Sequence, residues 1–502
     1  MTVVTDQILA DYWRMHPVEG THAGVHDFDS VAPDLSPNGL DERRAWREGA
    51  RSMLESTVEE DLDHRVLLAE MVRLTIVDDE WQWPRRAPQL HLEQALNGLQ
   101  YLLARPPAAS ASEAILARVD AIPRLLLEAR RNLRGDLVPP EFVEIALVGS
   151  AGAQRFLAEL PVATESARQA VADFEQFLQV DLEARGSFAL GRDAFERLLH
   201  EVHAVPLSAD EVFDHGRELA QQLLAQLGPS WRSEVESLKR EHPTREALLE
   251  TYATEALRAR EFVERRGLVE IPPGESFEVR PTAPFLRATM PLGHFDRTPP
   301  FSPSDNLGVL YITPVDPQLS DARQAELLEA HCFTAVRAIC LHETFPGHHV
   351  QLWHAKLRGT PVRRQFPSPL FTEGWALYCE ELMEEAGYYD SPALRVWRLK
   401  NALWRAVRLM VDVGLHCRGL RLEDAAQPLI ELGGLEPNTA RGEALRYTSS
   451  PTQPGSYMLG RDRIVELRRL AERRPGFVLA EFHRKLLGFS SISPALIPES
   501  EF

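Results

Sequence analysis

The stretch 341–353, LHETFPGHHVQLW, constrains this chain more than any other. His342 and Glu343 are adjacent, and His348 and His349 follow a Pro-Gly step. The stretch continues an apolar segment whose pattern predicts a buried helix. Buried helices rarely carry three imidazoles and a carboxylate unless those groups have partners or hold a metal ion. We therefore expect these side chains either to bind a metal ion or to be fully paired.

The spacing of the histidines departs from the known pattern His-Glu-x-x-His, in which two histidines one turn apart bind zinc and the glutamate is the general base. Pro346 stands where the second histidine would be. If the Pro-Gly step lets two residues bulge out of the helix, His348 returns to the face of His342. A bulge of three residues would bring His349 there instead. We favour His348 and keep His349 as the alternative ligand.

A catalytic zinc ion needs a third protein ligand and an open position. Glu373, at the start of the predicted helix TEGWALYCEELMEEAG, is the best candidate. Glu380 and Glu381, two turns further on, either support the ligands from behind or belong to a solvated face. With Glu373 present, a metal site is favoured over a helix end with incidental histidines. A di-iron site needs two Glu-x-x-His pairs, and the chain has only one, in the N-terminal loop.

Composition limits the partners and the compartment. The chain has 502 residues and a net charge of −19 without a lysine-rich run, which argues against nucleic acid or an anionic membrane as partner. No apolar run approaches the roughly 20 residues of a membrane span, and the N-terminus does not read as a signal peptide. The four cysteines show no paired spacing, which predicts buried free thiols and a cytoplasmic location.

The chain is expected to be mainly α-helical and to form a single catalytic unit over residues 1–502. Residues 1–37 predict a short helix and an ordered loop in which His22 and His26 make hydrogen bonds. Residues 1–270 form a helical body, and 271–318 form a small sheet whose most regular strand is Asn306–Thr313. Residues 319–502 carry the metal-binding and catalytic helices. One helix should begin near Ser320–Asp321 and run into the motif; later helices are expected at 392–418, 422–432, 440–447 and 457–473.

Four motifs, HETFPGHHVQ, TEGWALYCEEL, RLMVDVGLHCRG and PTQPGSYMLG, together with the opening WRMHPVEGTHAGVHDFDSVAPDLSP, resemble a bacterial family of uncharacterised zincin-like proteins. The family is related to gluzincin metallopeptidases such as carboxypeptidase Taq, thimet oligopeptidase and angiotensin-converting enzyme. The resemblance implies a large helical zincin-like (gluzincin) fold with a small β-sheet just before the metal-binding helix and a deep central cleft. It also implies one zinc ion per chain, held by His342, His348 and Glu373, with Glu343 as the general base.

Two further motifs gain a meaning from the resemblance. The relatives use a tyrosine near the C-terminus to hydrogen-bond the oxyanion, and Tyr457 matches it, with Tyr447 as the alternative. Arg408, Asp412 and His416 follow at four-residue steps on one helix face. They form either an internal salt network or a site in which Asp412 orients His416 toward substrate. Arg461 is predicted either to bind a substrate carboxylate or to form a structural ion pair.

These observations predict a zinc-dependent peptidase or amide hydrolase that acts on short peptides. The helical body 1–270 would wall the cleft, and the strand Asn306–Thr313 would pair with an extended substrate, as an edge strand can. Two alternatives remain from the sequence. One is a non-catalytic helical scaffold that binds a ligand and carries a degenerate metal site. The other is a metal-dependent hydrolase of a non-peptide amide.

Overall fold

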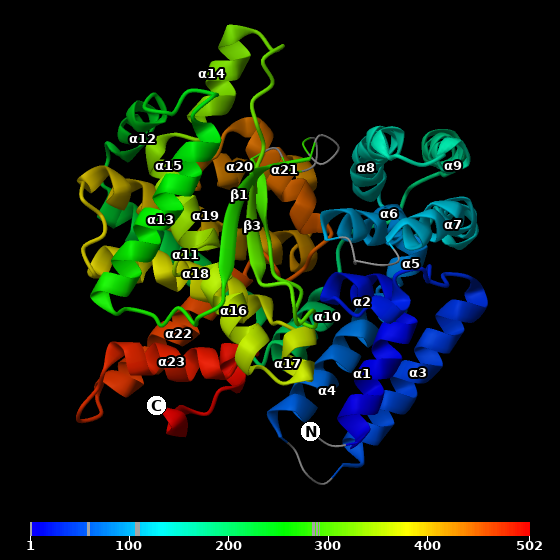
Figure 1. Ribbon diagram of the computed structural model, residues 1–502, viewed down its shortest axis with the longest axis horizontal. Helices are drawn as coiled ribbons and strands as arrows, with labels where there is room; N and C mark the ends of the chain where they lie inside the picture. Colours follow the sequence, from blue (N-terminus) through cyan, green and yellow to red (C-terminus); the bar gives the residue numbers. More distant parts are fainter. Residues whose placement is uncertain (1–2, 58–60, 106–110, 284–286, 288–289, 291) are drawn as a thin grey trace. The chain divides into compact units, whose positions relative to one another are not determined.

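The computed structural model describes residues 3–57, 61–105, 111–283, 287, 290 and 292–502 and divides into two compact units. Unit 1 comprises Met1–Leu190, Pro284–Thr289 and Pro299–Ser304, and unit 2 comprises the remainder. Both are built from helices, and the described residues contain one small sheet, which lies in unit 2 (Figure 1). The predicted mainly α-helical class and the place of the sheet are confirmed. The functional division at residues 270 and 318 and the central cleft stay predictions.

Unit 1 is built from helices. One of its apolar core clusters is formed by residues of α6, α7, α8 and α9, with Leu35, the turn after α7 and Leu178 of the π-helical turn η3 (Phe177–Asp181). Polar caps fix several helix starts: the Ser36 hydroxyl accepts from the Gly39 N–H at the start of α3, and Asp61 does the same for α4. The helices are α1 (Val3–Met15), α2 (Pro17–Ala23), α3 (Pro37–Glu55), α4 (Leu62–Leu74), the π-helical turn η2 (Thr75–Glu80), α5 (Trp83–Arg86), α6 (Pro88–Ala104), α7 (Ala111–Asn132), α8 (Pro140–Glu159) and α9 (Glu165–Gln176).

The segment after α1 differs from the predicted loop. Pro17 stands at the first position of α2, where its missing N–H has no cost, and Gly24 closes that helix in the left-handed conformation. His26 has the expected hydrogen-bond partner nearby in the loop, whereas the contact seen for His22 is a ring stack on α6. The His22 ring stacks on Tyr101 with centroids 4.1 Å apart, and His26 Nδ1 lies 2.9 Å from Asp29 Oδ2.

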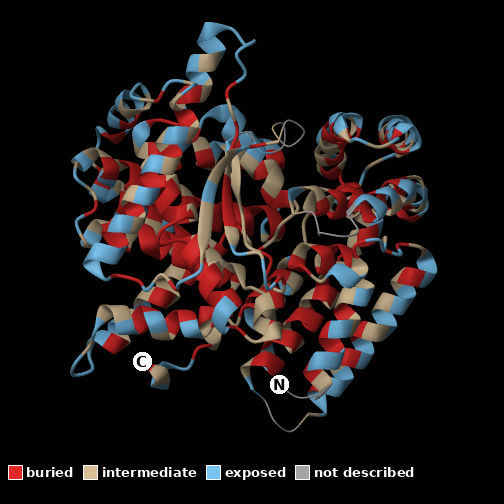
Figure 2. Cartoon of the chain, in the orientation of Figure 1, coloured by how far each residue is buried: buried red, intermediate tan, exposed pale blue. Residues whose placement is uncertain are grey.

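Unit 2 contains the stretch 341–353 and all other site residues that were predicted from the sequence. Its most deeply buried helices are α18 and α19, which are largely red in Figure 2. The helices are α10 (Arg192–Arg197), η4 (Leu198–Val202), α11 (Ala209–Leu227), α12 (Trp231–Lys239), α13 (Leu248–Arg266), α14 (Asp321–Glu329), α15 (Phe333–Glu343), α16 (His348–Arg358), α17 (Pro361–Gln365), α18 (Pro369–Glu385), α19 (Pro392–Cys417), α20 (Leu422–Glu431), α21 (Pro437–Thr448), α22 (Ser456–Glu472) and α23 (Leu479–Gly488).

The sheet has the order β1-β3-β2, with β1 (Ser276–Pro281), β2 (Gly293–Asp296) and β3 (Leu307–Ile312). Strand β3 pairs in parallel with β1 and antiparallel with β2, so both of its edges are occupied. The prediction that residues 306–313 form an edge strand open to substrate is therefore wrong. Leu310 and Ile312 of β3 pack with residues of α13 and α15 in one apolar cluster, which fixes α15 against the sheet.

The helix predicted to run from Ser320 into the motif is two helices. Helix α14 ends at Glu329, and Cys332 is extended, with φ −56° and ψ 156°, before α15 begins. The break is stabilised by unit 2 neighbours: the Phe333 N–H donates to the Glu241 carbonyl, and His331 Nδ1 lies 3.0 Å from Tyr252 Oη. All four cysteines are free, and three of them are buried. None of the described helices is both long enough and apolar enough to cross a membrane.

Candidate metal centre

Helix α15 stops at Glu343, and α16 begins at His348, so the Pro-Gly step separates two helices rather than bulging one. The Thr344 hydroxyl donates to the Cys340 carbonyl, and the Trp375 indole N–H of α18 donates to the Pro346 carbonyl at 2.9 Å. Residue 347 must be glycine for steric reasons, because a methyl group on Gly347 would lie 1.8 Å from the His342 carbonyl oxygen. The close approach that glycine permits brings the start of α16 against the end of α15.

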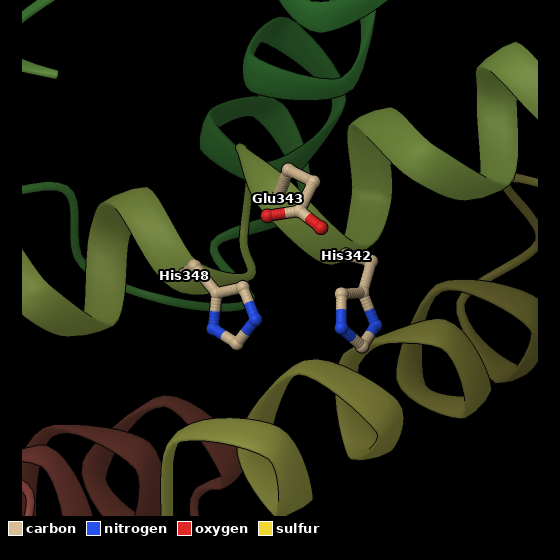
Figure 3. Close-up of side chains that lie close together, drawn as sticks. All are labelled: His342, Glu343 and His348. Atoms are coloured by element: carbon tan, nitrogen blue, oxygen red, sulfur yellow. The ribbon is translucent and has the colours of Figure 1, made fainter. Parts of the chain in front are cut away.

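This break brings the imidazole rings of His342 and His348 together, edge to face. Their ring centroids are 4.8 Å apart, and Figure 3 shows the two imidazoles projecting from the end of one helix and the start of the next. Single ligand atoms of His342, Glu343 and His348 all lie within 4.8 Å of one another, so this group could hold a metal ion. His342 is buried, whereas Glu343 and His348 are partly exposed. The predicted return of His348 to the side of His342 is confirmed.

A second carboxylate, Glu373 of α18, lies between the two imidazoles. Its Oε2 is 3.6 Å from His342 Nε2 and 3.5 Å from His348 Nε2, too long for good hydrogen bonds. The same oxygen is buried and has no hydrogen-bond partner. Two ligands each about 2 Å from a tetrahedral ion are about 3.3 Å apart. The two distances from Glu373 are close to this value, and a buried oxygen without a partner is one that a cation would satisfy.

Glu380, also on α18, supports His342 from behind. It is 1 % exposed, and its Oε1 lies 2.9 Å from His342 Nδ1 and 3.2 Å from Arg405 Nη2. Burial lowers the pKa of His342, but Glu373 and Glu380 outweigh it and raise that pKa to about 9. Burial raises the pKa of Glu373, but His342 and His348 outweigh it and hold that pKa well below its usual range. Both carboxylates thus remain ionised beside the imidazoles.

His349, the alternative ligand, points elsewhere. It is 2 % exposed, and its Nε2 lies 2.8 Å from Glu275 Oε2, which precedes β1. Its ring packs against Phe277, Phe295 and Phe345. Glu275 in turn pairs with Arg260 of α13 at 2.7 Å. His349 therefore joins α16 to the sheet and is not one of the clustered groups.

Tyr457, at the start of α22, lies beside the imidazoles. Its ring is nearly parallel to that of His342, with centroids 6.2 Å apart. The guanidinium groups of Arg405 and Arg408 on α19 lie 5.6 Å and 4.5 Å from the Tyr457 ring. Burial and the Glu373 charge raise the pKa of Tyr457, so its phenol keeps its proton and can donate it in a hydrogen bond.

The other predicted site residues have structural partners within unit 2. Arg461 Nε lies 3.0 Å from Glu381 Oε1, and the Tyr447 hydroxyl donates to Glu443 at 2.6 Å. His416 is 1 % exposed, with its Nε2 3.0 Å from the Tyr447 carbonyl oxygen. Asp412 accepts from the Thr452 N–H at 3.0 Å. These contacts favour the structural interpretation of each residue over a direct role with substrate.

His294 of β2 is a neighbour of the site that no sequence motif indicates. Burial lowers the pKa of His294, against the raising effect of the Asp296 and Glu343 charges. Its ring stacks on Tyr311 of β3 with centroids 4.9 Å apart. No local sequence pattern connects a histidine in a strand with a helix end much further along the chain. The place of His294 becomes visible only when β2 is paired with β3.

Helices α18 and α22 approach each other at two glycines. A methyl group at Gly374 would lie 2.5 Å from the Gly460 carbonyl carbon, and one at Gly460 would lie 1.8 Å from the Leu370 carbonyl oxygen. Only glycine allows two backbones to come this close. Gly374 follows Glu373 directly, and Gly460 lies one turn after Tyr457, so this crossing sets the carboxylate and the phenol on facing helices.

The chain belongs to the DUF885 family, which is described as "Bacterial protein of unknown function"; the family model matches residues 17–500. No curated protein matches the chain. The family part of the sequence-based prediction is therefore confirmed, at the level of an uncharacterised bacterial family.

Two solved structures share the fold. One is from Shewanella oneidensis and is titled as a "putative lipoprotein of unknown function"; it has a TM-score of 0.76 at 19 % identity, over 98 % of this chain and 97 % of that one. The other, the "putative lipoprotein from Colwellia psychrerythraea", has a TM-score of 0.78 at 17 % identity, over 99 % and 97 % of the two chains. At these identities the likeness shows the fold alone.

Proposed function

We propose that this DUF885 protein is a zinc-dependent hydrolase of amide bonds in short peptides, related to the gluzincin peptidases. The observation that supports this most is the position of Glu373 Oε2, which has no hydrogen-bond partner and lies 3.6 Å and 3.5 Å from the Nε2 atoms of His342 and His348. Two imidazoles and one carboxylate form a ligand set that catalytic zinc sites use. A bound zinc ion supplies a Lewis acid that polarises a carbonyl and lowers the pKa of water to about 7.

Glu380 favours zinc ligation by His342 at Nε2. Its carboxylate accepts the Nδ1–H of His342 at 2.9 Å, which fixes the tautomer with a free lone pair on Nε2. The lone pair then points toward the side on which Glu373 lies. The arrangement of carboxylate, histidine and cation is a recurrent one in zinc sites.

Glu343 is proposed as the general base. It follows His342 directly and belongs to the same group of ligand atoms within 4.8 Å, but its side chain is partly exposed. A carboxylate in this position accepts a proton from the attacking water and returns it to the leaving amine. Tyr457 is proposed to donate a hydrogen bond to the oxyanion, where a donor matters most because the charge develops only in the transition state.

The proposed substrate class, short peptides, is inferred from the sequence. The predicted cleft walled by a helical body favours short peptides or small amides over folded proteins. The edges that an extended substrate could use are β1 and β2, because β3 is paired on both sides. This part of the proposal is tested with a peptide library rather than with a single substrate.

The decisive experiment compares the zinc-loaded wild type with Glu343→Gln. We expect the variant to bind about one zinc ion per chain, as the wild type does, and to hydrolyse the library at least about 100-fold more slowly. Zinc is measured by elemental analysis and hydrolysis by mass spectrometry of the library. Glu385→Gln is the matched control, because Glu385 lies at the exposed end of α18 and pairs with Arg468.

Two results would contradict the proposal. Undiminished hydrolysis by a zinc-loaded Glu343→Gln protein would exclude Glu343 as the general base. Less than roughly 0.2 zinc per chain after zinc supplementation, with no gain in melting temperature, would favour a ligand-binding scaffold instead.

The proposed compartment is the cytoplasm, since the four cysteines are free. The names of the two solved relatives suggest the cell envelope as the alternative. Fractionation of the producing bacterium distinguishes the two: the cytoplasm predicts recovery in the soluble cytoplasmic fraction, and recovery with the membranes would overturn it.

A further inference from the structure

Unit 1 contains a cavity that the proposed hydrolase site does not use. Its volume is about 480 Å³, within the range of small-molecule sites, and all of its lining residues belong to unit 1. It lies among α1, α3, the π-helical turn η2, α5 and the start of α6. His16 and Glu19, from the opening motif WRMHPVEGTHAG, are among its lining residues, and neither has a role in the metal centre.

The cavity is rich in arginine. Seven arginines line it against four acidic residues, in a chain whose net charge is −19. A local excess of arginines over acidic residues is not expected from the composition of such an acidic chain. It indicates a place where negative charge from outside the chain is favourable.

Most of these arginines already have carboxylate partners. The π-helical turn η2 directs the consecutive residues Asp78 and Asp79 toward α3, where Arg47 pairs with both and Arg44 pairs with Asp79 at 3.0 Å. Arg73 of α4 is held by Glu70 at 2.7 Å. These pairs explain how α3 is fixed to η2, and among the described residues they leave Arg43 and Arg85 without a carboxylate partner.

Arg43 differs from Arg85 in that one of its guanidinium nitrogens is buried. It has no ion pair or hydrogen bond with any described residue, and its Nη2 is buried without a partner. Burial lowers the pKa of Arg43, against the raising effect of the more distant Asp78 and Asp34 charges. A guanidinium nitrogen that is buried without a partner is costly, and an oxyanion is the ligand whose geometry matches a guanidinium.

Part of the wall is uncharged. The His16 ring stacks on Tyr12 with centroids 4.5 Å apart, and burial followed by the Arg43 charge holds the pKa of His16 well below its usual range. His16 is therefore neutral and does not compete for an anion. Leu40, Trp83 and Leu90 add apolar surface.

The backbone at the cavity is also unusual. A π-helical turn lines one side, and Gln82 next to it is left-handed, with φ 56° and ψ 45°. π-Helical turns and left-handed residues other than glycine are uncommon and occur often at functional sites. Here both hold lining residues in place.

We propose that this cavity of unit 1 binds a small carboxylate with a hydrophobic body, whose carboxylate pairs with Arg43 and whose body lies against Leu40 and Trp83. The site is independent of the metal centre, since no residue is shared. Its ligand is defined by one anionic group and an apolar remainder of a size suited to about 480 Å³.

The test uses full-length protein treated with a chelator, so that a carboxylate cannot bind through a metal ion. 3-Phenylpropionate is titrated by calorimetry, with its neutral amide and inorganic phosphate as comparison probes. We expect saturable one-to-one binding of the acid only, weakened at least roughly tenfold in Arg43→Gln, because a hydrogen-bonded ion pair is lost. Arg51→Gln is the matched control, since Arg51 lies two turns along the same helix, pairs with Glu55 and is outside the cavity.

Arg85→Gln provides a second variant if Arg43→Gln does not fold. Arg85 lines the cavity and is exposed, and among the described residues its side chain hydrogen-bonds only to Gln82, so its replacement leaves the core intact. A severalfold loss of affinity in this variant supports the site. Equal binding by both cavity variants and the wild type, equal binding of the amide, binding of phosphate alone or no binding of the acid would each overturn the proposal.

Discussion

Glu380 determines which nitrogen of His342 is available to a cation. The carboxylate is almost fully buried and lies between His342 Nδ1 and Arg405. Replacing it with glutamine keeps the volume but removes the charge that holds the Nδ1–H. The imidazole then loses its fixed tautomer, and the Arg405 cation loses its partner.

We therefore expect Glu380→Gln to weaken zinc binding about 10- to 100-fold. Competition with a chelator of known affinity measures this. Glu381→Gln is the control, because Glu381 is the next residue on the same helix and pairs with Arg461 rather than with a histidine. Equal zinc affinity in the two variants would show that the support behind His342 is not needed.

Tyr457 is expected to act in the transition state rather than in binding. Removing a single oxyanion donor lowers kcat about 100- to 1,000-fold in other hydrolases. We expect Tyr457→Phe to lower kcat by this factor while KM and zinc content stay within about twofold of the wild type. Steady-state kinetics on a peptide from the library provide the measurement.

Tyr447→Phe is the matched control for Tyr457. The Tyr447 hydroxyl donates to Glu443 and accepts from Arg408 at 2.8 Å, so its loss should lower the melting temperature and leave kcat nearly unchanged. The reverse result, with kcat falling in Tyr447→Phe and unchanged in Tyr457→Phe, would exchange the roles of the two tyrosines.

At the scale of elements, the break between α15 and α16 determines the geometry of the metal centre. The two helices meet at Gly347, where a side chain would overlap the His342 carbonyl oxygen at 1.8 Å. We expect Gly347→Ala to lower the free energy of unfolding by about 3 kcal/mol or more and to weaken zinc binding, because the helix ends must separate. Urea denaturation and a zinc titration measure the two effects.

Gly442→Ala is the control for this prediction. Gly442 lies inside α21 with no atom within 4 Å of the place of an added methyl group, so the change should stabilise the protein by up to about 1 kcal/mol. A Gly347→Ala protein that behaves like Gly442→Ala would show that the closeness of α15 and α16 does not matter for zinc.

Several elements follow from the sequence alone. The observed bounds of α19, α20, α21 and α22 lie within a few residues of those expected from apolar periodicity, and Gly387 closes α18 in the left-handed conformation. The Pro-Gly step favours His348 over His349 as the neighbour of His342 but leaves His349 open, and the structure places His348 there. These features are local, because caps, turns and periodicity act within a few residues.

Features that depend on distant segments were not predictable in this way. The partner of His349 is Glu275, which lies 74 positions earlier in the sequence. The central place of β3 depends on pairing with β1, and the inward orientation of Glu380 depends on where α18 packs. His416 was left between two roles, and its burial and its contact with the Tyr447 carbonyl become visible only when α19 and α21 are placed together.

For the whole molecule, buried neutral histidines link stability to pH in both units. Burial lowers the pKa to about 4 for His91 in unit 1 and for His331, His416 and His483 in unit 2. The unfolded chain binds these protons near pH 6.5, so each histidine destabilises the fold as the pH falls from about 6.5 toward 4. Above pH 6.5 the contribution vanishes, because both states are neutral.

His483 allows a direct test. Its Nδ1 lies 2.7 Å from the Leu268 carbonyl and its Nε2 2.7 Å from Tyr378 Oη, so it joins α23 to α18 in its neutral form. We expect the unfolding free energy of His483→Gln to fall less steeply than that of the wild type between pH 6.5 and 5, by about 1.4 kcal/mol per pH unit. Urea denaturation at several pH values measures the slopes, and equal slopes would show that His483 is protonated in the folded chain.

The contact between Gly374 and Gly460 has a consequence for how such a chain can change over generations. At each glycine the backbone of the facing helix leaves no room for a side chain. A larger residue is therefore not tolerated at either position, even if the other position could change later. The segments TEGWALYCEEL and PTQPGSYMLG, far apart in the sequence, are then inherited as one block. A library that recombines the two segments between divergent family members should yield folded protein chiefly where both come from the same parent.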